Sequence, residues 1–259
     1  MPYQNIAITG ASSGLGRALA LDYAKPGISL HLAGRDATRL GEVATTARAL
    51  GASVAETMLD VTDATATEAW VKGCGPLDLI IANAGISGGP GHGNLESAVQ
   101  VNAIFNTNVM GAFNTVLPAM ALMADQPIAA NGWRGRAVII GSIAGLIALP
   151  TSPAYSASKA ALDFWVTATA PNAAKDGVGL TLVRPGFIRT PMTARNPYKM
   201  PGLMDADDAA RIILAGLEAG KTHITFPGWF GLFARFGQML PKTVFSRVPR
   251  KPADHSLGG

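Results

Sequence analysis

Short apolar runs of strand length alternate with helix-like segments along most of this 259-residue chain, and the alternation constrains the fold more than any other feature. Strands joined by helices pair in parallel, because each connecting helix packs back onto the sheet. The pattern therefore predicts a doubly wound α/β fold, with a mostly parallel sheet and helices on both faces. Strands are expected at residues 5–9, 28–33, 53–58, 77–82, 136–141, 179–183 and 223–226.

The alternation continues without a linker or an internal repeat, so residues 1–259 are expected to form one domain. Residues 228–259 are interpreted as an apolar and basic extension of that domain. A long helix rich in amide side chains is expected to reach Asn108. The helix that bears Tyr155 and Lys159 is expected to run towards Ala170, with Pro171 interrupting its later half, because proline cannot donate a helical hydrogen bond.

A glycine-rich turn separates the first strand from the first helix. It reads T-G-A-S-S-G-L-G and places Gly10, Gly14 and Gly16 where the strand ends and the helix begins. A pyrophosphate can bind the free N–H groups at such a helix N-terminus, and glycine lets the backbone approach the phosphates closely. In this strand–turn–helix setting the turn predicts a dinucleotide-binding site of the Rossmann type.

A tyrosine and a lysine stand one helical turn apart at positions 155 and 159, so they share one helix face. The reference pKa of a phenol is near 10, and an ammonium group close by lowers that pKa by favouring the phenolate. Ser142 stands where a strand is expected to end, and its hydroxyl can hold a substrate oxygen beside the phenol. Together these three side chains predict general acid–base chemistry on a carbonyl or alcohol.

The motifs taken together resemble the short-chain dehydrogenase/reductase family. The chain carries T-G-A-S-S-G-L-G, N-A-G, N-V-M-G, G-S and Y-S-A-S-K in the order and spacing of the single-domain branch of that family, over roughly residues 4–227. The resemblance implies a catalytic tetrad of Asn108, Ser142, Tyr155 and Lys159. Tyr155 would exchange the proton, Ser142 would orient the substrate oxygen, Lys159 would hold the nicotinamide ribose, and Asn108 would keep a water that relays protons to Lys159.

The resemblance also implies the residues that contact the cofactor. Around the pyrophosphate it places Gly10, Ser12, Gly14, Leu15 and Gly16; around the adenosine it places Asp60, Val61, Asn83, Ala84 and Gly85. Around the nicotinamide it places Tyr155, Lys159, Pro185, Gly186, Ile188 and Thr190. Asp60 has an alternative interpretation as a simple helix N-cap, because D-V-T-D suits a cap as well.

The charges after the second strand bear on the choice between the two nicotinamide cofactors. The sequence there is Gly34-Arg35-Asp36. A guanidinium matches a phosphate, which predicts NADP(H) with Arg35 at the 2′-phosphate. NAD(H) remains the alternative, because Arg35 can also stack on adenine and because an acidic residue, such as Asp36, can bind the ribose hydroxyls.

The segment that follows Ser142 carries no charge from Leu146 to Pro150, and the resemblance places Ile86 and Met192 at the same cleft. We therefore expect a small apolar ketone or secondary alcohol as substrate, and an oxidoreductase acting as a carbonyl reductase. The alternative is a dinucleotide-binding sensor or scaffold with the same fold and no turnover.

The C-terminal residues 221–251 hold six Lys or Arg and no Asp or Glu, and residues 228–240 place apolar side chains at roughly helical spacing. This extension can be a lid over the cleft, a segment that contacts another subunit or the core, or a helix that lies on a membrane surface. The rest of the chain is nearly neutral, so we expect no nucleic acid as partner.

Hydrophobic residues make up 48% of the chain and charged residues 15%, which favours buried surface in a homodimer or homotetramer. The resemblance also implies that oligomer, with the helix that carries Tyr155 pairing between subunits; Pro171 in that helix departs from the family pattern. The single cysteine, Cys74, is expected to be a packing residue and fits a reducing, cytoplasmic location. The four histidines show no ligand spacing, so no metal site is expected.

Overall fold

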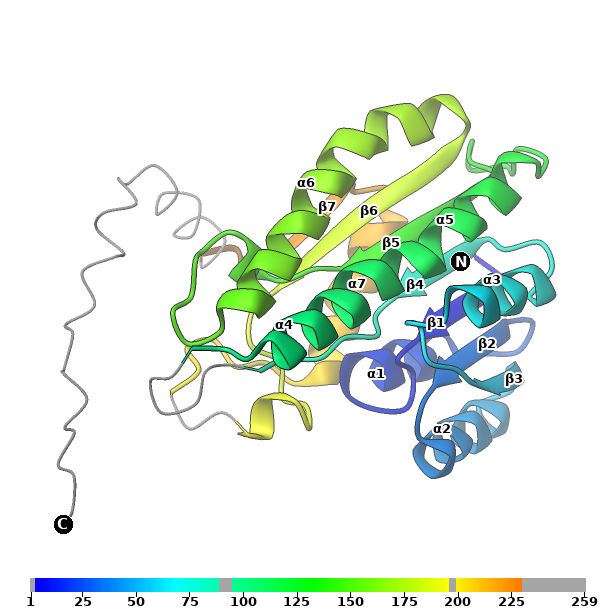
Figure 1. Cartoon of the computed structure of the whole chain (residues 1–259). Helices are drawn as coiled ribbons and strands as arrows, with labels where there is room; N and C mark the ends of the chain where they lie inside the picture. Colours follow the sequence, from blue (N-terminus) through cyan, green and yellow to red (C-terminus); the bar gives the residue numbers. More distant parts are fainter. Residues whose placement is uncertain (1–2, 89–94, 196–198, 230–259) are drawn as a thin grey trace, which may run out of the picture.

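The computed structural model describes residues 3–88, 95–195 and 199–229. Within this part of the chain, seven strands form one parallel sheet in the order β3-β2-β1-β4-β5-β6-β7 (Figure 1). The strands are β1 (Asn5–Thr9), β2 (Ser29–Gly34), β3 (Ser53–Met58), β4 (Leu79–Ala82), β5 (Gly135–Ile140), β6 (Val178–Pro185) and β7 (His223–Phe226). The predicted doubly wound parallel sheet is confirmed.

Helices cover both faces of the sheet, and the hydrophobic core is accordingly divided in two. On one face, buried side chains of α1 (Gly14–Tyr23), α2 (Ala37–Ala49) and α7 (Ala206–Glu218) pack against the sheet. On the other face the core is built from α3 (Ala64–Gly73), α5 (Gly111–Ala124) and α6 (Pro153–Lys175). Alternate residues of β1 point to opposite faces, with Ile6 and Ile8 in the first core and Ala7 in the second.

The expected long amide-rich helix is three segments in the structure. It consists of α4 (Ala98–Phe105), a π-helical turn (Asn106–Met110) and α5. Since π-helical turns occur mostly inside α-helices and often at functional sites, the position of Asn108 within this one is notable.

The helix that carries Tyr155 and Lys159 is longer than expected. It is continuous to Lys175 with Pro171 inside it, so the expected interruption at Pro171 does not occur. Leu162, Val166 and Ala173 hold the helix against the sheet on both sides of Pro171 through their burial in the core. The tertiary packing therefore compensates for the backbone hydrogen bond that proline cannot make.

The proposed extension, residues 228–259, lies outside the described residues from position 230 onwards, so the lid, subunit-contact and membrane interpretations all fall there. In the described part of the chain, no helix combines the length and the apolar character needed to cross a membrane.

Candidate active site

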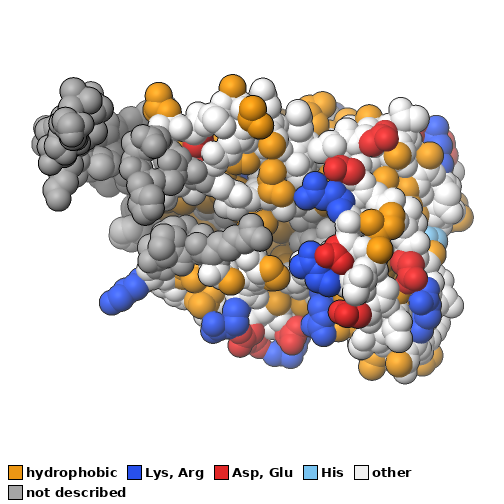
Figure 2. Space-filling model, turned by 60° about the horizontal axis from the view of Figure 1, so that its bottom comes forward, with side chains coloured by type: hydrophobic (Ala, Val, Ile, Leu, Met, Phe, Trp, Pro, Cys, Tyr) orange, Lys and Arg blue, Asp and Glu red, His pale blue; other side chains and the backbone are white. Residues whose placement is uncertain are grey.

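A cleft of about 450 Å³ opens at the carboxyl ends of the strands. The sheet changes direction between β1 and β4, because the chain leaves β1 towards β2 on one side and returns to β4 on the other. Ligands of doubly wound folds bind at such a switch point. Figure 2 shows this face hollowed near its centre, with basic and acidic side chains beside the hollow.

The cleft collects most of the predicted cofactor residues from five separate loops. Its lining includes Gly10, Ser12, Gly14, Leu15, Arg35, Asp60, Val61, Asn83, Ala84, Gly85, Pro185, Gly186, Ile188 and Thr190, together with Ser142, Tyr155 and Lys159. Residues up to 180 positions apart in the chain therefore border one cavity, which is large enough for an extended ligand.

The turn after β1 and the turn after β4 are joined directly. The side-chain amide of Asn83 donates to the carbonyl oxygens of Thr9 and Gly10, each at 3.1 Å. Gly10 has φ +65°, and a Cβ there would come within 2.8 Å of the Ala84 backbone. Only glycine permits both this backbone conformation and this close approach.

Gly16 does not line the cleft, although it was expected beside the pyrophosphate. It lies in α1, where a Cβ would stand 2.2 Å from the Gly10 carbonyl oxygen and 2.5 Å from the Asn83 amide nitrogen. Its role in the structure is therefore close packing of the helix against the two turns, which is the usual role of the third glycine in such a turn.

We expect Gly16→Ala to lower the free energy of unfolding by about 1–3 kcal/mol, because the added methyl group has no space beside Gly10 and Asn83. Gly41→Ala is the matched control, since Gly41 also lies in a helix but a Cβ there would meet nothing within 4 Å. That control is expected to gain up to about 1 kcal/mol from helix propensity. Urea unfolding of both variants measures the difference, and equal stability of the two would contradict the packing argument.

Tyr155 and Lys159 lie together on α6 and both face the cleft. The Lys159 Nζ lies 5.7 Å from the centroid of the Tyr155 ring and donates to the Ile140 carbonyl oxygen at 2.8 Å. Lys159 is only 6% exposed, and burial lowers its pKa from 10.5 to about 8. The ammonium form therefore still predominates at pH 7, where it favours the phenolate of the neighbouring tyrosine.

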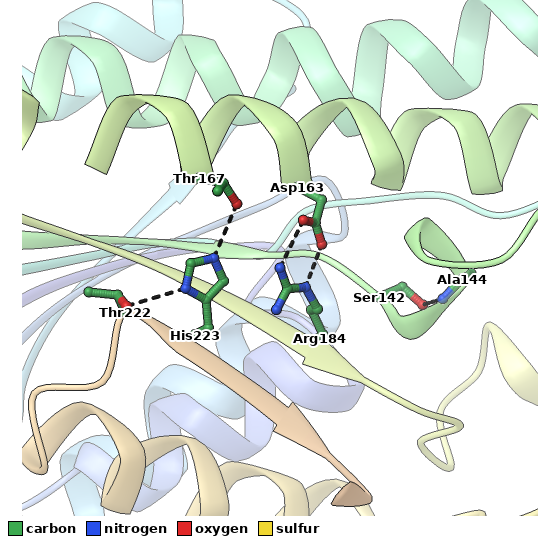
Figure 3. A network of polar contacts seen from close by, with 7 residues as sticks. All are labelled: Ser142, Ala144, Asp163, Thr167, Arg184, Thr222 and His223. Carbon is green, nitrogen blue, oxygen red and sulfur yellow. Dashed lines mark hydrogen bonds and ion pairs between the residues drawn. The ribbon is translucent and has the colours of Figure 1, made fainter. Parts of the chain in front are cut away.

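Ser142 stands between the end of β5 and a short 3₁₀ turn, Ile143–Gly145. Its hydroxyl oxygen accepts from the Ala144 N–H at 3.0 Å, which leaves the hydroxyl proton free to be donated into the cleft (Figure 3). Ser142 therefore both caps the 3₁₀ turn and lines the cleft.

Asn108 is buried and does not line the cleft. Its side-chain oxygen accepts from the Ile86 N–H at 2.8 Å, and its amide donates to the Ile86 oxygen at 2.9 Å and to Ser158 Oγ at 3.1 Å. The side chain therefore ties the loop after β4 to α6, and its predicted part in a proton relay stays a prediction.

Two arginines and two aspartates line the cleft just after β2 and β3. Asp36 caps α2 by accepting from the Arg39 N–H at 3.0 Å, and it pairs with Arg39 Nε at 2.8 Å. These bonds lower the pKa of Asp36, and the bond from the Arg39 N–H has the largest effect. Arg35 pairs with Asp60 at 3.4 Å, and both side chains are substantially exposed.

The alternative interpretation of Asp60 as a helix N-cap is wrong, because Asp63 caps α3 by accepting from Ala66 N–H. Asp60 instead accepts from the N–H and the hydroxyl of Thr62, at 3.0 and 2.8 Å. The Thr62 backbone bond is the main reason why the pKa of Asp60 is lowered.

A second cavity of about 120 Å³ adjoins the first, and Ser142, Tyr155, Gly186, Met192 and Thr193 border both. Of the predicted apolar wall, Ile147, Leu149 and Met192 line this cavity, whereas Leu146, Ala148, Pro150 and Ile86 do not. No charged side chain among the described residues lines it. Tyr155 and Ser142 therefore lie between the larger cleft on one side and an uncharged pocket on the other.

Residues 4–200 match the family model described as short chain dehydrogenase, which is most of the chain. The chain belongs to the short-chain dehydrogenase family. It is thus an oxidoreductase of that family, and the resemblance inferred from the motifs is confirmed.

Relatives of this short-chain dehydrogenase include an uncharacterised oxidoreductase of Myxococcus xanthus, 35% identical, with 97% of this chain and 98% of the relative aligned. A 3-dehydrosphinganine reductase of Arabidopsis thaliana, TSC10B, is 30% identical, with 94% of this chain and 76% of the relative aligned. The crystal structure of a family member from Burkholderia phymatum in complex with NAD superposes with a TM-score of 0.79 at 25% identity, covering 97% and 98% of the two chains.

Several residues of this short-chain dehydrogenase's site escaped the sequence analysis. Arg39 borders the larger cleft, while Ser87, Ser152 and Phe187 border the smaller cavity. Thr193 donates to the Ile188 oxygen at 2.6 Å and accepts from the Thr190 N–H at 3.0 Å, so it shapes the loop that carries Thr190. Of these residues, Arg39 could have been found from the sequence. It lies three positions after Asp36, a residue type that commonly caps a helix, and therefore in the first turn of the expected helix.

No group of three or more His, Cys, Asp or Glu side chains suited to a metal ion occurs in the described ranges. Cys74 is buried, and burial raises its pKa to about 12, which fits a packing residue rather than a nucleophile.

Proposed function

We propose that this short-chain dehydrogenase transfers a hydride between NADP(H) and an apolar ketone or secondary alcohol, with Tyr155 as the general acid and base. We further propose that residues 1–259 form a single dinucleotide-binding domain. The observation that carries the proposal is that Tyr155 and Ser142 border both cavities at once, the extended cleft and the uncharged pocket. A reacting carbonyl in the pocket would therefore lie beside a cofactor in the cleft.

The residues present fit a dinucleotide. Gly10, Ser12 and Gly14 of the turn after β1 line the cleft, and α1 begins there at Gly14 without a side-chain cap, so the N–H groups of its first turn are available to a phosphate. Gly10, Ser12, Gly14 and Leu15 would hold the pyrophosphate. The remaining lining of the cleft would hold the adenosine and nicotinamide ends as the family resemblance implies, with Thr190 at the carboxamide.

The bound nicotinamide would supply or accept the hydride. In the reductive direction Tyr155 donates its phenolic proton to the carbonyl oxygen, and Ser142 donates a hydrogen bond to that same oxygen. Lys159 stabilises the resulting phenolate by its charge and would hold the nicotinamide ribose. Asn108, through its bonds to Ile86 and Ser158, would keep the loop after β4 and α6 in place beside Lys159. In the oxidative direction Tyr155 takes the alcohol proton instead.

We infer a preference for NADP(H) from the adenosine end of the cleft. Asp36 is engaged by the helix N-terminus and by Arg39, so its carboxylate is occupied. Arg35 and Arg39 both line the cleft, and the Arg35–Asp60 pair is exposed and long, so a phosphate can replace it cheaply. The complex of the Burkholderia phymatum protein with NAD shows that this fold also accepts the other cofactor.

Arg35→Ala is expected to raise KM for NADPH by about tenfold or more, because a charge-assisted bond to the 2′-phosphate is lost. KM for NADH should change much less, since NADH has no such phosphate. Steady-state kinetics with both cofactors measures the two effects. Arg48→Ala is the control, because Arg48 is also an exposed, ion-paired arginine but lies outside the cleft lining. A wild-type enzyme that uses NADH tenfold better than NADPH would contradict the inference.

The substrate pocket is apolar apart from hydroxyl groups, which favours an uncharged carbonyl compound. The relative named 3-dehydrosphinganine reductase is in keeping with a lipid-like ketone. Oxidation of NADPH with a panel of long-chain, cyclic and charged ketones tests the proposal. Turnover of charged ketones alone would contradict the apolar class.

The alternative of a sensor or scaffold without turnover has the same fold and would bind the cofactor. It predicts NADPH binding with no oxidation for any ketone in the panel. The presence of Tyr155, Lys159 and Ser142 at one cavity favours the enzyme.

We also propose that two or four copies of this chain associate, in the cytoplasm. Large apolar side chains are exposed on the outer faces of α4, α5 and α6, among them Val99, Leu117 and Phe164, the first and last at 80%. Burial of these side chains by a second copy would remove them from water. Light scattering at micromolar concentration measures the assembly, and a monomer would contradict it.

A further inference from the structure

One face of α6 carries polar side chains at four-residue intervals: Tyr155, Lys159, Asp163 and Thr167. The last three each contact a different strand. Lys159 Nζ donates to the Ile140 oxygen at the end of β5, and Asp163 pairs with Arg184 of β6. Thr167 Oγ1 lies 3.2 Å from Nε2 of His223 on β7 (Figure 3).

The spacing of these contacts matches the geometry of the two elements. Four residues advance a helix by about 6 Å. Neighbouring strands lie about 4.8 Å apart. Since β5, β6 and β7 are successive neighbours, a helix that crosses them obliquely meets one new strand with each turn. The three contacts therefore hold both the position and the rotation of α6 on the sheet.

The middle contact is a buried ion pair. Arg184 and Asp163 side chains are 5% and 13% exposed, and Arg184 makes two parallel bonds, Nε to Oδ2 and Nη2 to Oδ1, the latter at 2.8 Å. The remaining Arg184 nitrogen, Nη1, is buried and has no hydrogen-bond partner among the described residues. Burial of two charges costs much of what their attraction returns, so an apolar pair of similar volume would stabilise the fold at least as well.

A contribution to stability therefore does not explain why an ion pair is present here. Its position next to the cleft does. Asp163 lies one turn after Lys159, and Arg184 immediately precedes Pro185 and Gly186, which line the cleft. The pair thus joins the helix that carries the proton donor to the strand end that borders the nicotinamide side of the cleft. An apolar pair lacks the directional bonds that define this placement.

We propose that Asp163 and Arg184 are positioning residues, whose bidentate pair fixes Tyr155 and Lys159 relative to the Pro185–Gly186 wall. The proposal rests on the proposed function for its catalytic consequence. The pair touches neither cavity, so it acts through the helix and not on the substrate.

The test compares the full-length wild type with the double variant Asp163→Leu/Arg184→Met, which replaces both charged side chains with apolar ones. We expect a melting temperature equal to or above that of the wild type, and kcat reduced about tenfold or more through misplacement of Tyr155. The dissociation constant for NADPH should change less than about threefold, because the adenosine end is untouched. Hydrogen exchange of the amides at 155–163 should become faster.

Asp208→Leu/Arg211→Met is the matched control, since it removes an exposed arginine–aspartate pair of α7 that lines neither cavity and should leave kcat within about twofold. A double variant with wild-type kcat overturns the proposal. Should the double variant fail to fold, Arg184→Lys replaces it, because lysine keeps the charge without the parallel bonds; wild-type kcat there overturns the proposal as well. If the wild type reduces no carbonyl compound, the proposed function fails. The positioning role is then tested by hydrogen exchange alone, and unchanged exchange of the amides at 155–163 in these variants would overturn it.

Discussion

Tyr155→Phe is expected to lower kcat by about 10²–10⁴-fold, because general acid–base catalysis contributes a factor of that order. The substitution removes the phenolic oxygen and keeps the ring, which borders both cavities. The substrate oxygen would keep its hydrogen bond from Ser142 but would lack a proton donor. The dissociation constant for NADPH should stay close to that of the wild type.

Tyr23→Phe is the matched control for this experiment. Tyr23 is a buried tyrosine of α1 that does not line the cleft, so its loss should leave kcat unchanged. Single-turnover mixing with NADPH separates the chemical step from product release. An unchanged chemical rate in Tyr155→Phe would refute the mechanism, whichever ketone is used.

Lys159→Met is expected to abolish most activity while making the cofactor-free protein more stable. The fall in the Lys159 pKa from 10.5 to about 8 on folding means that its charge opposes folding at neutral pH. That shift corresponds to about 3 kcal/mol. Loss of the bond to the Ile140 oxygen offsets about 1–3 kcal/mol of it. We expect a net rise in Tm of a few degrees, since about 1 kcal/mol shifts Tm by about 2–4 °C in a chain of this size.

The pH dependence provides a sharper test. Below pH 8 both folded and unfolded states keep the Lys159 proton, so the cost of burial is fully present. As pH rises from about 8 towards 10.5, the folded state loses that proton first, and the wild type gains stability. The advantage of Lys159→Met should therefore shrink across this window. Comparison with Lys72→Met, which removes an exposed lysine, isolates the effect of burial. A constant difference between pH 7 and pH 10 would contradict this account.

The sequence by itself determined all seven strands of the sheet, each to within about two residues at either end. Residues 5–9, 53–58 and 223–226 were predicted with the bounds that the structure shows. It also determined the turn at Gly10 and the face shared by Tyr155 and Lys159. All of these are local properties, since strand and helix periodicity and the conformational freedom of glycine act over a few neighbouring residues.

The tertiary structure alone decided which of these residues meet. Gly16 packs on Gly10 and Asn83 instead of facing the cleft, α6 continues past Pro171, and Asp36 turns towards Arg39. The pairing of Asp163 with Arg184 joins a helix to a strand 21 positions later. Such contacts depend on the order of strands in the sheet and on how each helix lies across it. Local periodicity carries no information on either, because the same pattern of apolar residues fits several packings.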